Sequence, residues 1–351
     1  MSISVVNASD QSGNAQLSEE AATDKVLQDL SQSMIEQTLN RLTPAQLKTL
    51  DEKCDAGASF ACETLSGVYK RGVNGPKDEA KEFYYTKKAC DAGSIISCGN
   101  LGVFYHDGMG TPKDHTKSIP FLIASCNDRQ PNACFYLGYA YKKGEGVDTD
   151  LTKASSALSK SCDLKFAFGC GGLGQLYMET AESDQDIQTA ISLYETACEM
   201  PKGYFGCYAL GVEYQSGERV DQDDEKSFRF FRLACLHGHN ESCINTGINY
   251  YRGTGVERDM RLAGEYLEPQ CVKRHTLACL YFAYQLKLGD GVPKDHGRAF
   301  SLFVLSCSDG FADGCFEVGL AYYDGQGVAI DRQKAQQYFD KSCALGIQEA
   351  C

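Results

Sequence analysis

The 18 cysteines are the residues of this chain whose type and spacing could do chemistry. They form nine pairs with seven residues between the members, except that the fifth pair has eight, and the pairs recur every 36 residues with one step of 37. Two thiols at this spacing can form a disulfide or supply half of a metal site. The pairs are Cys54/Cys62, Cys90/Cys98, Cys126/Cys134, Cys162/Cys170, Cys198/Cys207, Cys235/Cys243, Cys271/Cys279, Cys307/Cys315 and Cys343/Cys351.

The spacing favours disulfides over metal. Structural zinc usually takes four ligands, often from clips with two to four residues between cysteines, whereas no two cysteines here are closer than eight positions. Each pair supplies only two thiols, and the next pair lies a whole repeat away. We therefore expect nine disulfides, no metal and no cofactor. A chain so rich in disulfides indicates an oxidising compartment.

The elements that position these pairs follow from the period, which indicates a solenoid of stacked helical units. Counted from the second cysteine of a pair, an apolar residue stands three positions on, a small residue four on and a tyrosine seven on, as in Leu137, Gly138 and Tyr141. These positions form one face of an α-helix. Glycines ten and twelve positions on then end this first helix and permit a turn with positive φ.

An aspartate sixteen positions on is predicted to cap the second helix of each unit, because a carboxylate accepts from the free amides of a starting helix. A metal-ligand role is disfavoured, since successive copies stand a repeat apart. The second helix runs to the next pair, so each bridge joins it to the first helix of the following unit. The aspartates are Asp78, Asp114, Asp150, Asp186, Asp223, Asp259, Asp295 and Asp331.

The unit seen in residues 133–154 and 314–335 resembles the Sel1-like repeat, a relative of the tetratricopeptide repeat. With a cysteine pair at every junction, it is most similar to the Helicobacter cysteine-rich proteins. The resemblance covers residues 54–351 as eight units. It predicts an all-α fold, a right-handed α/α solenoid of about eight Sel1-like repeats crosslinked by disulfides. We expect residues 1–16 to be disordered and residues 17–53 to form N-terminal capping helices, the second of them starting at Thr43-Pro44.

Three local features depart from the repeat. Unit four has Thr180 and Glu182 in place of the turn glycines, and one extra residue precedes Cys207; a change of superhelix curvature is predicted there. Pro120 falls inside a second helix and is predicted to kink or shorten it, because proline removes a helical hydrogen bond. Pro269 falls near the end of another.

Composition excludes some partners. A net charge of −13 argues against nucleic acid, which requires a basic face, and no stretch has the roughly 18–20 apolar residues of a membrane span. The first ten residues have no apolar signal segment. We expect a secreted or periplasmic protein whose signal was removed, with the mitochondrial intermembrane space as the alternative. A monomer is expected.

Enzymatic turnover has little support in the residues. Members of the similar cysteine-rich family have been associated with penicillin binding and weak β-lactamase activity, so the resemblance implies that alternative. The serine β-lactamase motifs S-x-x-K and K-T-G are absent, as are H-E-x-x-H, G-x-S-x-G and the Walker A loop. No catalytic residue is assigned. His237 and His239, the one close histidine couple, are interpreted as solvated turn residues.

Binding is the better hypothesis. First helices of such solenoids line a concave groove, and residues two and nine positions after the second cysteine vary among units. We expect a scaffold that binds a protein, a peptide or a cell-wall-type ligand there; the alternatives are a penicillin-binding protein and a mitochondrial assembly factor. The groove candidates are Arg71, Asn100, Tyr136, Lys143, Asn245, Arg252, Tyr281 and Glu317; Asp107 and Asp324 occupy equivalent positions.

Overall fold

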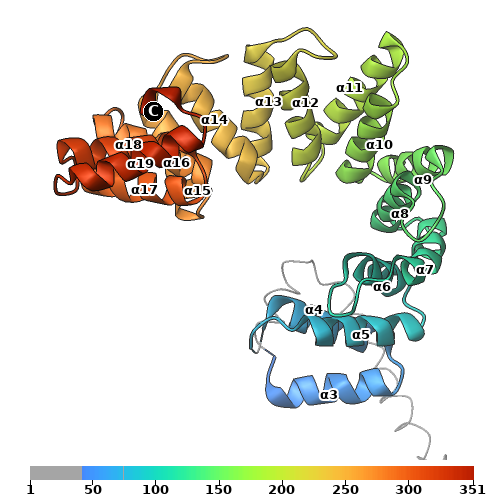
Figure 1. Ribbon diagram of the computed structural model, residues 1–351. Coiled ribbons are helices and arrows are strands. Elements are labelled where there is room, and N and C mark those ends of the chain that lie inside the picture. The colour runs from blue at the N-terminus through green and yellow to red at the C-terminus, as the bar shows by residue number, and fades with distance from the viewer. Residues whose placement is uncertain (1–41, 74) are drawn as a thin grey trace, which may run out of the picture. The chain divides into compact units, whose positions relative to one another are not determined.

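The computed structural model describes residues 42–73 and 75–351. In this part of the chain, helices are the regular secondary structure, and turns and loops join them. The chain divides into two compact units, one ending at Asp128 and one spanning Arg129–Cys351. The described helices of unit 1 are α3 (Pro44–Asp55), α4 (Ser59–Arg71), α5 (Glu79–Asp91), α6 (Ile95–Asp107) and α7 (His115–Asn127). Figure 1 shows their order along the chain.

Unit 2 continues the same alternation of first and second helices. Its helices are α8 (Pro131–Lys143), α9 (Leu151–Asp163), α10 (Ala167–Glu179), α11 (Asp184–Glu199), α12 (Tyr204–Ser216), α13 (Asp224–Leu236), α14 (Asn240–Arg252), α15 (Met260–Val272), α16 (Thr276–Leu288), α17 (His296–Ser308), α18 (Ala312–Asp324) and α19 (Arg332–Ala344), followed by the 3₁₀ turn η1 (Gln348–Ala350). The predicted all-α repeat solenoid is thereby confirmed.

Each first helix packs tightly on the second helix of its own repeat, and the small residue four positions after the cysteine makes this possible. A Cβ on Gly211 would lie 2.6 Å from the ring of Phe231, and one on Gly138 would lie 2.6 Å from Leu158 Cγ. Phe231 and Leu158 are fully buried. Because glycine has no side chain, the two helices can pack closely, as the dense interior of a protein requires.

The predicted caps of the second helices form in seven repeats. In α13, the side chain of Asp223 accepts a hydrogen bond from the backbone N–H of Lys226 at 2.9 Å. That bond and the nearby Lys226 ammonium hold the pKa of Asp223 below its usual range. The capping aspartates are Asp78, Asp114, Asp150, Asp223, Asp259, Asp295 and Asp331.

The prediction for Asp186 is wrong. Ser183 caps α11 instead, and Asp186 is the third residue of that helix, where its carboxylate accepts from the Ser183 backbone N–H at 3.1 Å. The two residues form a capping box, which satisfies the backbone N–H groups of Ser183 and Asp186 and starts the helix three residues earlier than predicted. As a result α11 has 16 residues, whereas α9 and α13 have 13. The curvature change predicted for this unit stays a prediction.

Pro120 does not shorten its helix, whereas the kink predicted as the alternative stays a prediction. Helix α7 keeps 13 residues with Pro120 inside it, and α15 keeps 13 residues with Pro269 inside it. Both prolines are exposed. The proline rings therefore lie on the solvent side of their helices, where water can satisfy a carbonyl left without a helical donor and so lower the cost of the lost hydrogen bond.

Disulfides join successive repeats. Eight bridges have Cα–Cα separations of 4.4–5.1 Å, and no cysteine of the described residues is free. The bridges are Cys54–Cys62, Cys90–Cys98, Cys162–Cys170, Cys198–Cys207, Cys235–Cys243, Cys271–Cys279, Cys307–Cys315 and Cys343–Cys351; Cys126 and Cys134 are likewise disulfide-bonded.

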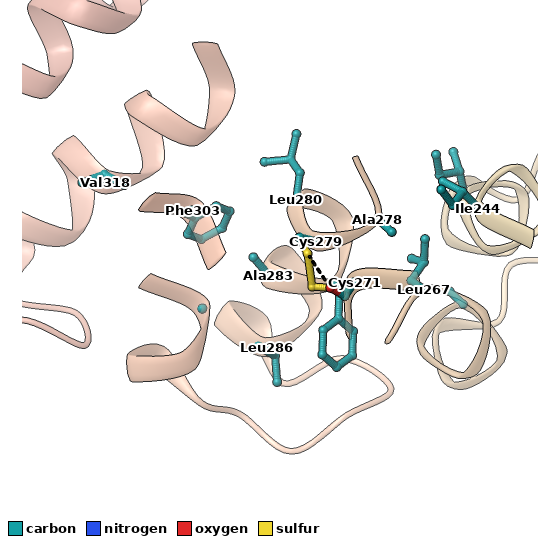
Figure 2. Close-up of a cluster of buried hydrophobic side chains, with 14 residues drawn as sticks. Ile244, Leu267, Cys271, Ala278, Cys279, Leu280, Ala283, Leu286, Phe303 and Val318 are labelled. Carbon is teal, nitrogen blue, oxygen red and sulfur yellow. Dashed lines mark hydrogen bonds between the residues drawn. A yellow bond between two sulfur atoms is a disulfide. The ribbon is translucent and has the colours of Figure 1, made fainter. Parts of the chain in front are cut away.

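An internal bridge forms part of the apolar core. Cys271–Cys279 lies among Leu267, Ala278 and Leu286, which come from α15 and α16, as Figure 2 shows. Both sulfur-bearing residues are buried. Each such bridge closes a short loop of nine residues or so, worth about 2.5 kcal/mol by the chain-entropy estimate.

The N-terminal prediction is described only in part. Helix α3 begins at Pro44 with Thr43 as its N-cap, and Thr43 and Gln46 form a capping box. The disorder predicted for residues 1–16 and the first helix of residues 17–53 lie outside the described residues.

Candidate functional site

The first helices of unit 2 form a shared surface because neighbouring ones contact one another, α8 with α10, α10 with α12, and α14 with α16. Side chains one, two, five, eight and nine positions after the second cysteine interact from one repeat to the next on this surface. We call this surface the groove face.

Two of the predicted groove residues meet on this face. Arg252, at the end of α14, donates a hydrogen bond to the hydroxyl of Tyr281 on α16. Its guanidinium also lies 5.4 Å from the Tyr281 ring centroid, within range of a cation–π interaction. Tyr251 contacts the same ring edge-on at 5.1 Å. The three side chains therefore hold one another in place across two repeats.

The other predicted residues do not gather into one cluster. Glu317 is buried and ion-pairs with Lys287, a residue outside the predicted set. Tyr136 lies edge-on to Phe135 at 5.4 Å. Lys143 is exposed on α8 and Asn245 half-buried on α14, three repeats further along. The structure places Arg71 and Asn100 in unit 1, on α4 and α6.

The sequence interpretation missed a polar network that joins α8 to α10. The ammonium of Lys142 lies 2.8 Å from one carboxylate oxygen of Glu179 and 2.9 Å from the other. Gln175 donates to Glu179 at 2.9 Å and accepts from the Tyr139 hydroxyl at 2.8 Å. The Lys142 side chain is only 4% exposed, so this ion pair is a fixed part of the face.

A signal for this network was present in the sequence. Position five after the second cysteine lies three residues from position two and four residues from position nine, and position eight lies three residues from position five, so these positions share one side of the helix. Tyr139, Gln175 and Lys142 occupy such positions. Including positions five and eight among the candidates would have found these residues, although not the partners that they select.

Aromatic side chains continue the groove face along the starts of the first helices. Phe168 lies 5.9 Å from Phe135 and 5.3 Å from Tyr204, and the ring of His239 stacks on Tyr204 at 5.3 Å and contacts Tyr208 at 4.6 Å. We call Phe135, Phe168, Tyr204, Tyr208 and His239 the aromatic row. All five are half-buried, so each presents an apolar surface that remains partly accessible.

His239 is more than the solvated turn residue predicted from the sequence. It caps α14, where its Nδ1 accepts from the Ser242 backbone N–H at 3.3 Å. Burial lowers the pKa of this imidazole, and the Glu241 carboxylate opposes the shift in part. The folded state therefore favours the neutral ring.

A pH prediction follows from this shift. Because the folded pKa of His239 is depressed, its contribution to stability is complete above the unfolded pKa of about 6.5 and is lost as the pH falls through the lower folded value. His239→Asn keeps a capping side chain, so the variant should lose less stability than the wild type between pH 7.5 and 5. Thermal unfolding at several pH values measures this.

His275→Asn is the matched control, since His275 precedes α16 at the equivalent position and makes no side-chain cap hydrogen bond. This variant shows what replacing a histidine at this position does to stability when no capping hydrogen bond is involved. A His239→Asn difference that widens on acidification would contradict the prediction.

Comparison with known families identifies the repeat. The model of the Sel1 repeat matches residues 61–94, 95–127, 131–154, 168–201, 205–239, 240–269, 277–311 and 312–347. The chain belongs to the Sel1 repeat family. Its members are protein-interaction scaffolds, and this chain is a disulfide-rich example.

Two solved structures with TM-scores above 0.5 share the fold. A protective antigen of uropathogenic Escherichia coli matches with a TM-score of 0.69 and 24% identity, over 87% of this chain and 65% of that one. A Sel1 repeat protein from Oxalobacter formigenes matches with a TM-score of 0.54 and 22% identity, over 92% and 93%. Helicobacter pylori cysteine-rich protein B is 28% identical over 37% of this chain and 96% of its own, with a TM-score of 0.28. No curated protein matches.

The disulfides of this Sel1 repeat chain indicate an oxidising, extracytoplasmic environment. Among the described helices, none combines the length and apolar character that crossing a membrane would need.

Proposed function

We propose that this protein is an exported scaffold, secreted or periplasmic, that binds a partner polypeptide along the groove face. The observation that carries the proposal is the pre-organised arrangement of Arg252, Tyr251 and Tyr281. Arginine and tyrosine are enriched at the centres of protein interfaces. Side chains held before binding lose less entropy when the partner docks.

The disulfides support the same proposal. Within unit 2, a bridge joins each second helix to the first helix of the next repeat, and a surface stiffened in this way suits recognition of an extended partner. Neither penicillin binding nor mitochondrial assembly gains support from the comparisons.

Crosslinking in intact cells of the native source, followed by affinity capture, tests the proposal. Arg252→Ala/Tyr281→Ala should weaken binding of the captured partner by about tenfold or more, as expected for interface hot spots. The control, Arg232→Ala/Leu236→Ala, removes two exposed side chains of the second helix α13. The proposal fails if the groove variant and this control bind the partner equally.

A further inference from the structure

A pocket of about 260 Å³ opens on the groove face between α10 and α12. Its volume suits one large side chain rather than a whole ligand. Apolar residues form most of the walls, and two carboxylates, the amide of Gln175 and the guanidinium of Arg219 lie among them. The lining includes Met178, Phe205, Val212, Tyr208, Glu179 and Glu213.

The pocket arises at the irregular fourth repeat. Gly171 on α10 allows the Phe205 ring to lie against the helix, because a Cβ there would be 2.4 Å from Phe205 Cδ1. Tyr194 of α11 also lines the pocket and is buried. Tyr208, which belongs to the aromatic row, also lines the pocket. The pocket is therefore continuous with the surface proposed to bind the partner.

The two carboxylates differ in how far their charge is compensated. Glu179 is held at both oxygens by Lys142. Glu213 is only 15% exposed, and the nearest cation that the structure places beside it, the 43% exposed Arg219, lies 4.0 Å away. Burial raises the pKa of Glu213, although Arg219 opposes the shift. A buried carboxylate with a distant counter-charge gains from a cation that can donate to it directly.

We propose that this pocket binds an arginine side chain of the partner polypeptide, with the guanidinium donating to Glu213 and stacking on Tyr208, and the methylene stem lying against Met178 and Val212. Arginine fits better than lysine because its planar fork pairs with a carboxylate at two points and stacks on aromatic rings. This inference rests on the proposed function.

The test uses the full-length oxidised protein and two probe peptides, acetyl-Gly-Gly-Arg-Gly-Gly-amide and its citrulline counterpart, a neutral isostere. The methyl signal of Met178, assigned by its loss in Met178→Leu, reports binding by NMR. The arginine peptide should shift this signal saturably, and the citrulline peptide should bind at least about tenfold more weakly, because charge-assisted hydrogen bonds are the stronger ones. Equal shifts from the two peptides, or no shift from either, would overturn the inference.

Variants locate the effect. Glu213→Gln keeps the shape and should weaken binding of the arginine peptide about tenfold. Glu195→Gln removes the same charge from an exposed position on the second helix α11 and should leave the affinity unchanged. Unchanged affinity in Glu213→Gln would overturn the inference. That failure is distinct from failure of the proposed function, which is judged by the captured partner and the Arg252→Ala/Tyr281→Ala variant.

Discussion

Replacing Cys271 and Cys279 with alanine is expected to lower the free energy of unfolding by about 3–5 kcal/mol. About 2.5 kcal/mol of this comes from opening the nine-residue loop. The remainder comes from packing, because both cysteines are buried in the core cluster with Leu267 and Leu286. Urea unfolding followed by circular dichroism measures the change, with the reduced wild type as a reference.

The Cys343–Cys351 bridge provides the control. It closes a loop of the same length, but Cys351 is exposed. The entropic contribution should be equal, so the alanine pair here should cost only about 2.5 kcal/mol. The difference between the two pairs then measures what burial adds. Equal costs would show that the internal bridge stabilises through the loop alone.

Removal of the internal Cys271–Cys279 disulfide should also change how the protein unfolds. In a repeat protein each repeat contacts only its neighbours, so the cooperativity of unfolding depends on the interfaces between repeats. The Cys271–Cys279 bridge joins α15 to α16 at such an interface. Its removal should broaden the urea transition more than removal of Cys343–Cys351 does.

Local interactions explain why most of the framework could be predicted from the sequence. The cap of α13 needs only Asp223 and an amide three residues later, and the turn after α14 needs only a glycine at Gly253, where φ is +74°. Such features depend on a few adjacent residues, and the period repeats them. Asp186 shows the limit of this reasoning. It occupies the repeat position of the capping aspartate, but Ser183, three residues earlier, caps the helix instead.

The groove face was harder to predict because its contacts join different repeats. Lys142 and Glu179 are 37 residues apart, and neither residue type indicates its partner. Arg252 and Tyr281 were both candidates, yet the pairing between them depends on how α14 packs against α16. The pocket beside Glu213 depends further on the Gly171–Phe205 contact. This contact belongs to one repeat junction, so the repeat pattern of the sequence does not predict it.

Gly255→Ala is expected to destabilise the protein by about 3–4 kcal/mol. Gly255 lies in the turn after α14 with a φ of +68°, which an L side chain adopts only with strain. In addition, a Cβ there would lie 1.9 Å from the backbone oxygen of Asp224, at the start of the preceding second helix, α13. Because that neighbour is backbone, it cannot rotate away, and the two repeats must separate.

Gly238→Ala separates the two causes. Gly238 has a φ of +91°, but a Cβ there would meet nothing within 4 Å. Its substitution should therefore cost only the backbone strain, about 1–2 kcal/mol. Urea unfolding of both variants gives the contribution of the contact between repeats as the difference. Equal stability of the two alanine variants would contradict the prediction. It would mean that the close backbone contact at Gly255 does not explain the glycine at the second turn position of the repeat.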